Sequence, residues 1–159
     1  GLGFEVHSGE MGPPSSIAES LDILEADRIG HGVAAIHDPV LLDRLVRDQV
    51  VLDVCPSSNV GTGLFPSLKA HPVAAFWRAG VNMTISSDDP PFFATTLIDE
   101  LSHVARLAGL SRADLATLQR RAARAAFADD KARDAMVADI DAWLAPSERL
   151  TRLDQRPGE

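Results

Sequence analysis

The stretch VVLDVCPSSN, residues 50–59, changes abruptly from an apolar run to a run of small polar residues. Its first half is rich in β-branched side chains, which is typical of a strand buried in a parallel sheet. Three other stretches have the same form, namely FEVHSGE (4–10), RIGHG (28–32) and VNMTISSDDP (81–90). The sequence between them has the apolar spacing of helices, so we predict strands that alternate with helices.

This alternation predicts an α/β fold with a parallel sheet, because right-handed strand–helix–strand connections place the helices outside the sheet. Four such units make half of an eight-stranded barrel, and an open flavodoxin-like sheet is the alternative. We favour the half-barrel because polar residues follow every strand and because the first and last strands lack polar edge protection. We therefore expect half of a (β/α)8 TIM-type barrel that ends in helices. Residues 146–159 read as a charged, disordered tail.

Local signals locate several elements along the chain. Ser16 and Glu19 form a capping box, which predicts that a helix begins there. The pair Asp38–Pro39 is a typical start of the next helix, with the carboxylate as cap and proline in the first turn. The stretch 56–68, PSSNVGTGLFPSL, reads as a long loop.

Composition limits the classes of function. The chain has 159 residues and a formal net charge of −8, which disfavours nucleic acid as a partner. No apolar run approaches the ~20 residues of a membrane span, so we expect no membrane partner. Cys55 is the only cysteine, so an intrachain disulfide is excluded and a cytoplasmic location is the default. The chain begins at Gly1 without methionine, and we expect it to be a piece of a longer polypeptide.

Two polar strand ends hold histidines and a carboxylate. His7 and Glu10 follow the first apolar run, where an imidazole could bind zinc and a carboxylate in a partly dry site could transfer a proton. His31 lies between two glycines, which would let a ligand approach its ring closely. Each residue also has a structural interpretation, as a satisfied core histidine, a solvated loop acid or part of a tight turn.

The adjacent carboxylates Asp88 and Asp89 are the most indicative pair. They follow an apolar strand and precede two prolines. Because like charges repel, a cation or a hydrogen-bonding ligand is needed to keep both ionised. A helix cap beside a solvated acid is the structural alternative.

Several other residues of reactive types favour structural roles. Cys55 reads as a small buried hydrophobe rather than a nucleophile. The run Ser57–Asn59 could bind a ligand or simply make a turn. The remaining histidines lie beside or within helices and are expected at the surface: His37, His71 and His103.

In this order, the motifs H-S-G-E, R-I-G-H-G, C-P-S-S-N and S-D-D-P resemble the C-terminal half of the adenosine/adenine deaminase family. That family belongs to the metal-dependent amidohydrolases, which have a (β/α)8 barrel. The resemblance covers about residues 1–145. It implies hydrolytic deamination of a 6-aminopurine, and the RIGHG motif leans towards adenosine, with inosine and ammonia as products. Adenine and modified adenosines are the alternatives within the family.

The resemblance also implies roles for individual residues. His7 and Asp88 would bind one Zn²⁺ per complete site. Glu10 would protonate a ring nitrogen of the purine, while His31, with Asp88 assisting, would orient and deprotonate the attacking water. Gly9 and Asp89 would bind the purine nucleoside or base.

Two further zinc ligands of the family, an H-x-H motif on its first strand, do not occur in this sequence. A catalytic zinc site usually has three or more protein ligands, so we expect the N-terminal half of the barrel as a partner and no activity from this chain alone. A non-catalytic nucleoside-binding protein with the same fold is an alternative. A flavodoxin-like binding protein unrelated to deaminases is another.

Overall fold

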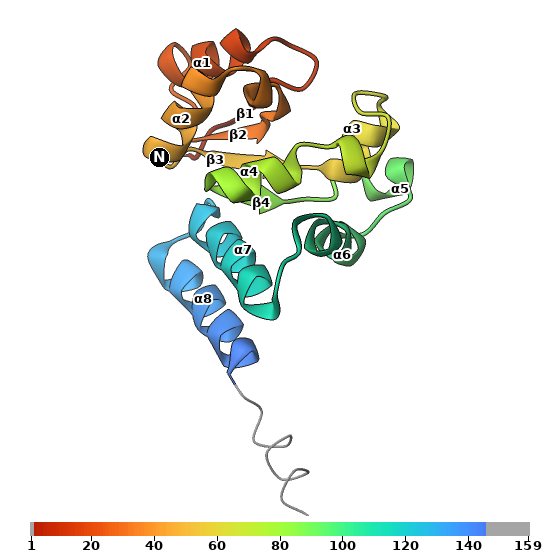
Figure 1. Ribbon diagram of the computed structural model, residues 1–159. Helices are drawn as coiled ribbons and strands as arrows, with labels where there is room; N and C mark the ends of the chain where they lie inside the picture. The colour runs from red at the N-terminus through yellow and green to blue at the C-terminus, as the bar shows by residue number, and fades with distance from the viewer. Residues whose placement is uncertain (1, 146–159) are drawn as a thin grey trace, which may run out of the picture.

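The computed structural model describes residues 2–145, in which four parallel strands form one sheet in the order β1-β2-β3-β4 (Figure 1). The strands are β1 (Glu5–Ser8), β2 (Arg28–His31), β3 (Val51–Val54) and β4 (Met83–Ile85). The helices are α1 (Pro14–Asp22), α2 (Pro39–Arg47), α3 (Pro56–Gly61), α4 (Val73–Ala79), α5 (Pro90–Phe93), α6 (Leu97–Ala108), α7 (Arg112–Ala125) and α8 (Asp130–Leu144), with 3-10 turns η1 (Val33–His37) and η2 (Leu68–Ala70). The predicted α/β class with a parallel sheet and outer helices is confirmed as part of a barrel.

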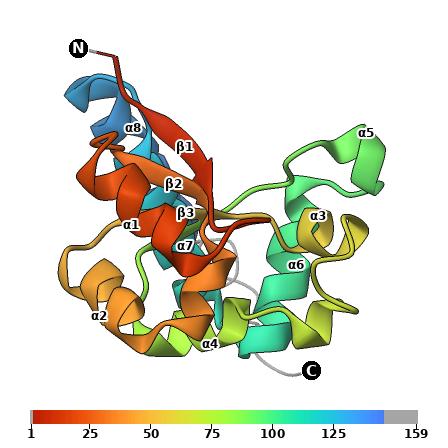
Figure 2. The ribbon, with the colours of Figure 1, turned by 90° about the horizontal axis from the view of Figure 1, so that it is seen from above.

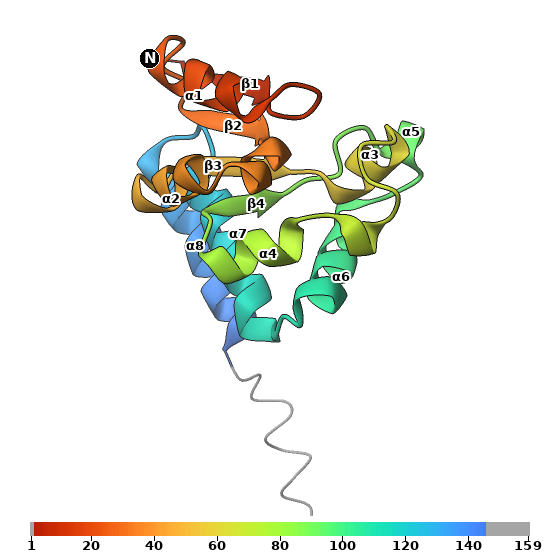
Figure 3. The ribbon, with the colours of Figure 1, turned by 45° about the horizontal axis from the view of Figure 1, so that its top comes forward.

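The helices fall into two groups. Helices α1, α2 and α4 lie within the connections between strands, while α6 and α7 pack on β4 and α8 packs on α7. Figures 2 and 3 place α3 and α5 beyond the carboxyl ends of the strands, where β3 and β4 lead into them. Across residues 2–145, none of the helices combines the length and the apolar character that crossing a membrane requires.

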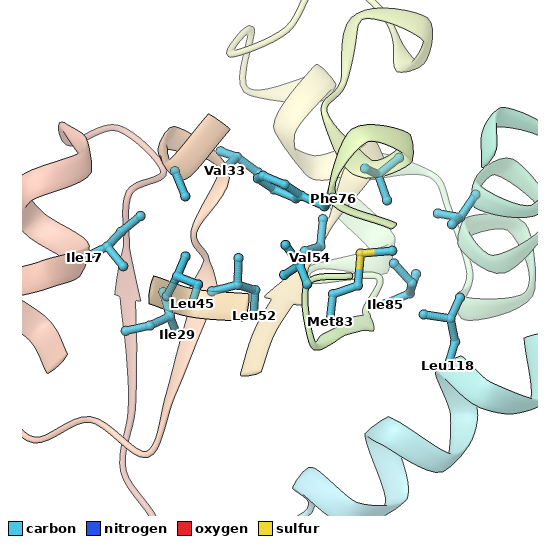
Figure 4. Packing of buried hydrophobic residues seen from close by; sticks show 14 of the residues in the cluster. Ile17, Ile29, Val33, Leu45, Leu52, Val54, Phe76, Met83, Ile85 and Leu118 are labelled. Carbon is cyan, nitrogen blue, oxygen red and sulfur yellow. The ribbon is translucent and has the colours of Figure 1, made fainter. Parts of the chain in front are cut away.

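The face of the sheet that packs against the helices is apolar and buried. Ile29, Leu52 and Met83 are neighbours in register on adjacent strands, and all three are fully buried. Figure 4 shows them in one layer with side chains from the helices, including Ile17, Leu45 and Phe76. Because successive residues of a strand point to opposite faces, this layer also fixes which residues face the other way.

The opposite face is polar, and we refer to it as the lumen face, because in a barrel it points inward. It carries Glu5, His7, Arg28, Asp53 and Thr84. Arg28 pairs with Glu5, and the Thr84 hydroxyl donates a hydrogen bond to Asp53 Oδ1 at 2.7 Å. The sheet therefore presents polar side chains on the side where the rest of a barrel would close.

The structure corrects the predicted start of the first helix. Helix α1 begins at Pro14 after Pro13, and Ser16 does not cap it. The Ser16 hydroxyl instead donates to the Pro13 carbonyl at 2.7 Å and accepts from the Gly9 backbone N–H at 3.2 Å. By contrast, the predicted Asp38 cap is confirmed, because its carboxylate accepts from two backbone N–H groups of α2.

The predicted loop over residues 56–68 is also wrong, because it contains α3. The Ser57 backbone N–H donates to the carboxylate of Glu100, which is fully buried on α6. This contact satisfies one of the free donors at the start of α3 and comes from a distant part of the sequence. The predicted tail, 146–159, lies outside the described residues.

Candidate active site

Four predicted site residues meet at the carboxyl ends of the strands, with His31 between the others. The imidazole rings of His7 and His31 meet edge-on, with their centroids 4.8 Å apart. His31 Nε2 lies 3.6 Å from Glu10 Oε2 and 4.0 Å from Asp88 Oδ2. The ends of β1, β2 and β4 thus bring two imidazoles and two carboxylates together.

The backbone at His31 explains how its ring reaches this site. His31 follows Gly30 on β2, so regular alternation would turn its side chain to the apolar face, beside Ile29. Its φ is instead 65°, in the left-handed region, and Asp88 has a φ of 56°. Such a conformation costs a non-glycine residue on the order of 1 kcal/mol or more and tends to occur at functional sites. Both strained residues aim their side chains into the cluster.

The two glycines beside His31 make room for other side chains. A Cβ on Gly30 would lie 2.5 Å from Cδ2 of the His7 ring. A Cβ on Gly32, whose φ is 66°, would lie 2.8 Å from a methyl carbon of Leu52. Gly30 therefore allows the His7 ring to lie across β2, and the predicted approach of a ligand to the His31 ring stays a prediction.

Helix α3 supplies two side chains whose role the sequence left open. The hydroxyl of Ser58 donates to Asp88 Oδ2 at 2.7 Å. The amide nitrogen of Asn59 donates to Glu10 Oε1 at 3.4 Å and lies 3.3 Å from His31 Nδ1. Both residues are buried, so α3 holds the carboxylates and the imidazole from behind.

His71 is buried behind the site, which contradicts its predicted place at the surface. Its Nε2 lies 3.1 Å from Asn59 Oδ1, and its ring meets the Phe65 ring edge-on. The chain buries this histidine because Val73 and Phe76, which follow it on α4, are part of the core. Burial, with a smaller effect of His31, lowers the pKa of His71 to about 4.

Burial also shifts the pKa of two groups nearer the cluster. It lowers the pKa of His31, against the opposing effect of the Glu10 carboxylate and together with repulsion from His7. It raises the pKa of the Cys55 thiol, which stays protonated at neutral pH. Cys55 is buried, as its predicted packing role requires.

The donor atoms fit a zinc ion. His7, Glu10 and His31 each offer one ligand atom within 4.8 Å of the others, as do His31, Cys55 and Asp88. Imidazole and carboxylate groups are ordinary zinc ligands, whereas a protonated thiol is a poor one. The predicted ligands, His7 and Asp88, belong to different groups that share His31.

The two residues predicted to bind the purine lie at the border of the cluster. Gly9 is buried with a φ of 62°, and a Cβ there would lie 2.4 Å from a methyl carbon of Ile17, so it is required for packing. Asp89 is exposed at the start of α5. Their contact with a purine stays a prediction.

Two small hollows adjoin the cluster and share Glu10 as a lining residue. One, of ≈ 270 Å³, is also lined by His7, and the other, of ≈ 250 Å³, extends over apolar side chains such as Val33 and Phe65. A larger cavity of ≈ 760 Å³ lies near the amino end of β2, beside Arg28. The converging polar groups, and not cavity size, identify the hollows at Glu10 as the candidate binding region.

Known proteins of one family match this chain in sequence and in fold. The family model described as Adenosine deaminase matches residues 1–143. An adenine deaminase from Agrobacterium fabrum is 44% identical over 140 residues, which cover 88% of this chain and 43% of the relative. An aminodeoxyfutalosine deaminase from Streptomyces avermitilis is 43% identical over 150 residues, which cover 92% of this chain and 42% of the relative.

Among solved structures, an adenine deaminase from Arthrobacter aurescens superposes with a TM-score of 0.84 at 34% identity. The match covers 88% of this chain and 43% of that protein. The chain thus spans less than half the length of the proteins that it matches.

Proposed function

The chain belongs to the adenosine deaminase family, and on that premise we propose that it forms the proton-transfer part of an active site that hydrolyses the amino group of a 6-aminopurine. The observation that carries this proposal is the position of His31, which contacts carboxylates from two other strand ends. The confirmed family resemblance supports the same chemistry. Because the chain spans about 43% of its relatives, we propose that it belongs to a longer protein, called the intact protein below.

In this proposal each residue of the cluster has a defined task. His7 and Asp88 would hold Zn²⁺, which when bound supplies an acidic water at neutral pH. His31 Nε2 and Asp88 Oδ2 lie 4.0 Å apart, close enough for both groups to contact that water. One would orient the water and the other would take its proton. Glu10, as the protonated acid, donates to a ring nitrogen of the purine while the water oxygen attacks the carbon that bears the amino group. The proton taken from the water then passes to the amino nitrogen, the carbon–nitrogen bond breaks, and ammonia leaves. The proton of the new hydroxyl returns to Glu10 as the carbonyl forms.

We also propose that the intact protein supplies the missing zinc ligands. The chain has no H-x-H motif, and the lumen face leaves His7 exposed. Strands that continue the sheet past β1 and β4 would close a barrel over this face and bring further ligands to the zinc.

The substrate is proposed to be adenine or a 6-amino nucleoside. The RIGHG motif favours adenosine, whereas similar proteins include adenine deaminases and an aminodeoxyfutalosine deaminase. The apolar hollow beside Glu10 suits a flat heteroaromatic ring.

The test is ammonia release by the intact, zinc-loaded protein from adenine, adenosine and aminodeoxyfutalosine. We expect release from at least one, and the highest kcat/KM identifies the substrate. A zinc-loaded protein that binds these purines without turnover would instead be a non-catalytic nucleoside-binding protein.

A further inference from the structure

A line of three buried polar side chains runs from the active site into the protein. It consists of His31, Asn59 and His71, whose exposed fractions are 2%, 0% and 4%. Asn59 Oδ1 lies 3.1 Å from His71 Nε2, and Asn59 Nδ2 lies 3.3 Å from His31 Nδ1. Asn59 and His71 have no task in the chemistry above, yet burying polar groups is costly unless each is paired correctly.

A backbone group determines which nitrogen of His71, the innermost of the three residues, carries the proton. The Val73 N–H donates to His71 Nδ1 at 3.1 Å. A backbone N–H can only donate, so His71 Nδ1 must be an acceptor without a proton. The single proton of the neutral ring is therefore on Nε2, and the low pKa of His71 agrees with a neutral ring.

The proton on His71 Nε2 then orients the amide of Asn59. That N–H donates to Asn59 Oδ1, so the amide NH₂ points the other way, towards His31 Nδ1 and Glu10 Oε1. The flipped amide would set two donors against each other at His71. The carboxylate oxygen of Glu10, 3.4 Å away, independently favours the same orientation.

The amide in turn decides which nitrogen of His31 carries the proton. Because Asn59 donates to Nδ1, that nitrogen must accept, and the ring proton is on Nε2. His31 Nε2 is the nitrogen that faces Glu10 Oε2 and Asp88 Oδ2. A ring that presents N–H at this position donates a hydrogen bond and cannot take a proton there.

We propose that Asn59 and His71 are positioning residues that hold the proton of His31 on Nε2, so that His31 donates a hydrogen bond to the attacking water and Asp88 takes the water's proton. This inference rests on the proposed function for the identity of the water. As the water O–H bond breaks, its proton forms a new O–H bond on Asp88. The freed electron pair of the oxygen forms the bond to the purine carbon, and the ring nitrogen gains the proton of Glu10.

The test reads the tautomer directly. In the intact, zinc-loaded protein with ¹⁵N-labelled histidine, two-bond ¹H–¹⁵N spectra show which ring nitrogen is protonated, and His31→Gln and His71→Gln assign the signals. We expect both His31 and His71 to carry the proton on Nε2. A proton on Nδ1 of His31 in the unaltered protein overturns the inference, and this measurement needs no variant of Asn59.

Asn59→Asp tests the relay, by which we mean the hydrogen bonds that run from His71 through Asn59 to His31. A carboxylate still accepts from His71 but cannot donate to His31, so we expect the His31 proton to move to Nδ1. The kcat should fall about 10- to 100-fold, the range for residues that orient a catalytic group, with little change in KM. Asn82→Asp is the matched control, because Asn82 is the only other asparagine and its amide bonds to the Gln49 carbonyl.

These outcomes separate the inference from the proposed function. An unchanged His31 tautomer in a folded Asn59→Asp variant contradicts the relay, whatever the activity. An intact protein that deaminates no purine but has the expected tautomer contradicts the proposed function. It also contradicts the hydrogen bond from His31 to the attacking water, while the relay itself stands.

Discussion

Glu10 is the residue on which the proposed chemistry depends most directly. Its carboxylate lies 3.6 Å from His31 and borders both hollows beside the cluster. In the intact protein, Glu10→Gln keeps the shape of the side chain but removes the acid. We expect kcat for the purine to fall by about 10²- to 10⁴-fold, the usual contribution of general acid catalysis.

Glu19→Gln is the matched control for Glu10, because Glu19 is an exposed acid on α1. It should leave kcat unchanged. Unaltered rates in Glu10→Gln would refute the assignment of Glu10 as the acid.

Gly30 determines whether His7 can occupy its position as a zinc ligand. The Cβ that Gly30→Ala adds would lie 2.5 Å from the His7 ring, so the ring must move. We expect the zinc affinity of the intact protein to fall about 10-fold or more, measured by competition with a chelator. Gly109→Ala is the control for destabilisation alone, because its φ of 68° strains an alanine while nothing lies near the added carbon. Full zinc affinity in Gly30→Ala would show that His7 is not a ligand.

At the scale of elements, α3 and the start of α4 hold the buried pair Asn59 and His71 in place. The pKa of His71 is about 4 in the folded protein, below its ordinary value of 6.5. Between these values the unfolded chain binds a proton that the folded protein does not. The free energy of unfolding should therefore be highest above about pH 6.5 and decline as the pH falls towards 4. The contribution of His71 is about 3 kcal/mol.

The measurement is denaturant unfolding of the intact protein at several pH values. His71→Gln should show a weaker decline between pH 6.5 and 4, since glutamine does not titrate there. His37→Gln, at an exposed position, should behave like the unaltered protein. An equal decline in all three proteins would mean that His71 is protonated in the folded state.

The elements that the sequence predicted well are those specified by their own residues. The strands follow from apolar, β-branched runs, and the start of α2 follows from the Asp38 cap. Helix α3 was missed because the donor at Ser57 is satisfied by Glu100, which lies far away in the chain. The proposed cap at Ser16 failed because its hydroxyl bonds to Gly9 and Pro13 instead.

The site residues divide in the same way, into those specified by the local sequence and those that depend on distant contacts. His7, Glu10, His31 and Asp88 could be predicted because they directly follow strands, whose carboxyl ends meet at one edge. The burial of His71 depends on how α3 packs against α4, which periodicity does not show. The apolar run that begins at Val73 was the available signal for it.

At the scale of the whole molecule, the chain presents a polar lumen face and a cluster of four potential zinc and proton-transfer groups. It covers 43% of the Arthrobacter adenine deaminase with a TM-score of 0.84. We propose that these strand ends form one part of a deaminase site and that the intact protein supplies the rest.

The decisive measurement is ammonia release from adenine, adenosine and aminodeoxyfutalosine. It is made side by side for the zinc-loaded intact protein and for the 159-residue chain with added zinc. We predict turnover of at least one purine by the intact protein and none by the chain alone. Turnover by the chain alone, or none by the intact protein on any of the three, would contradict this proposal.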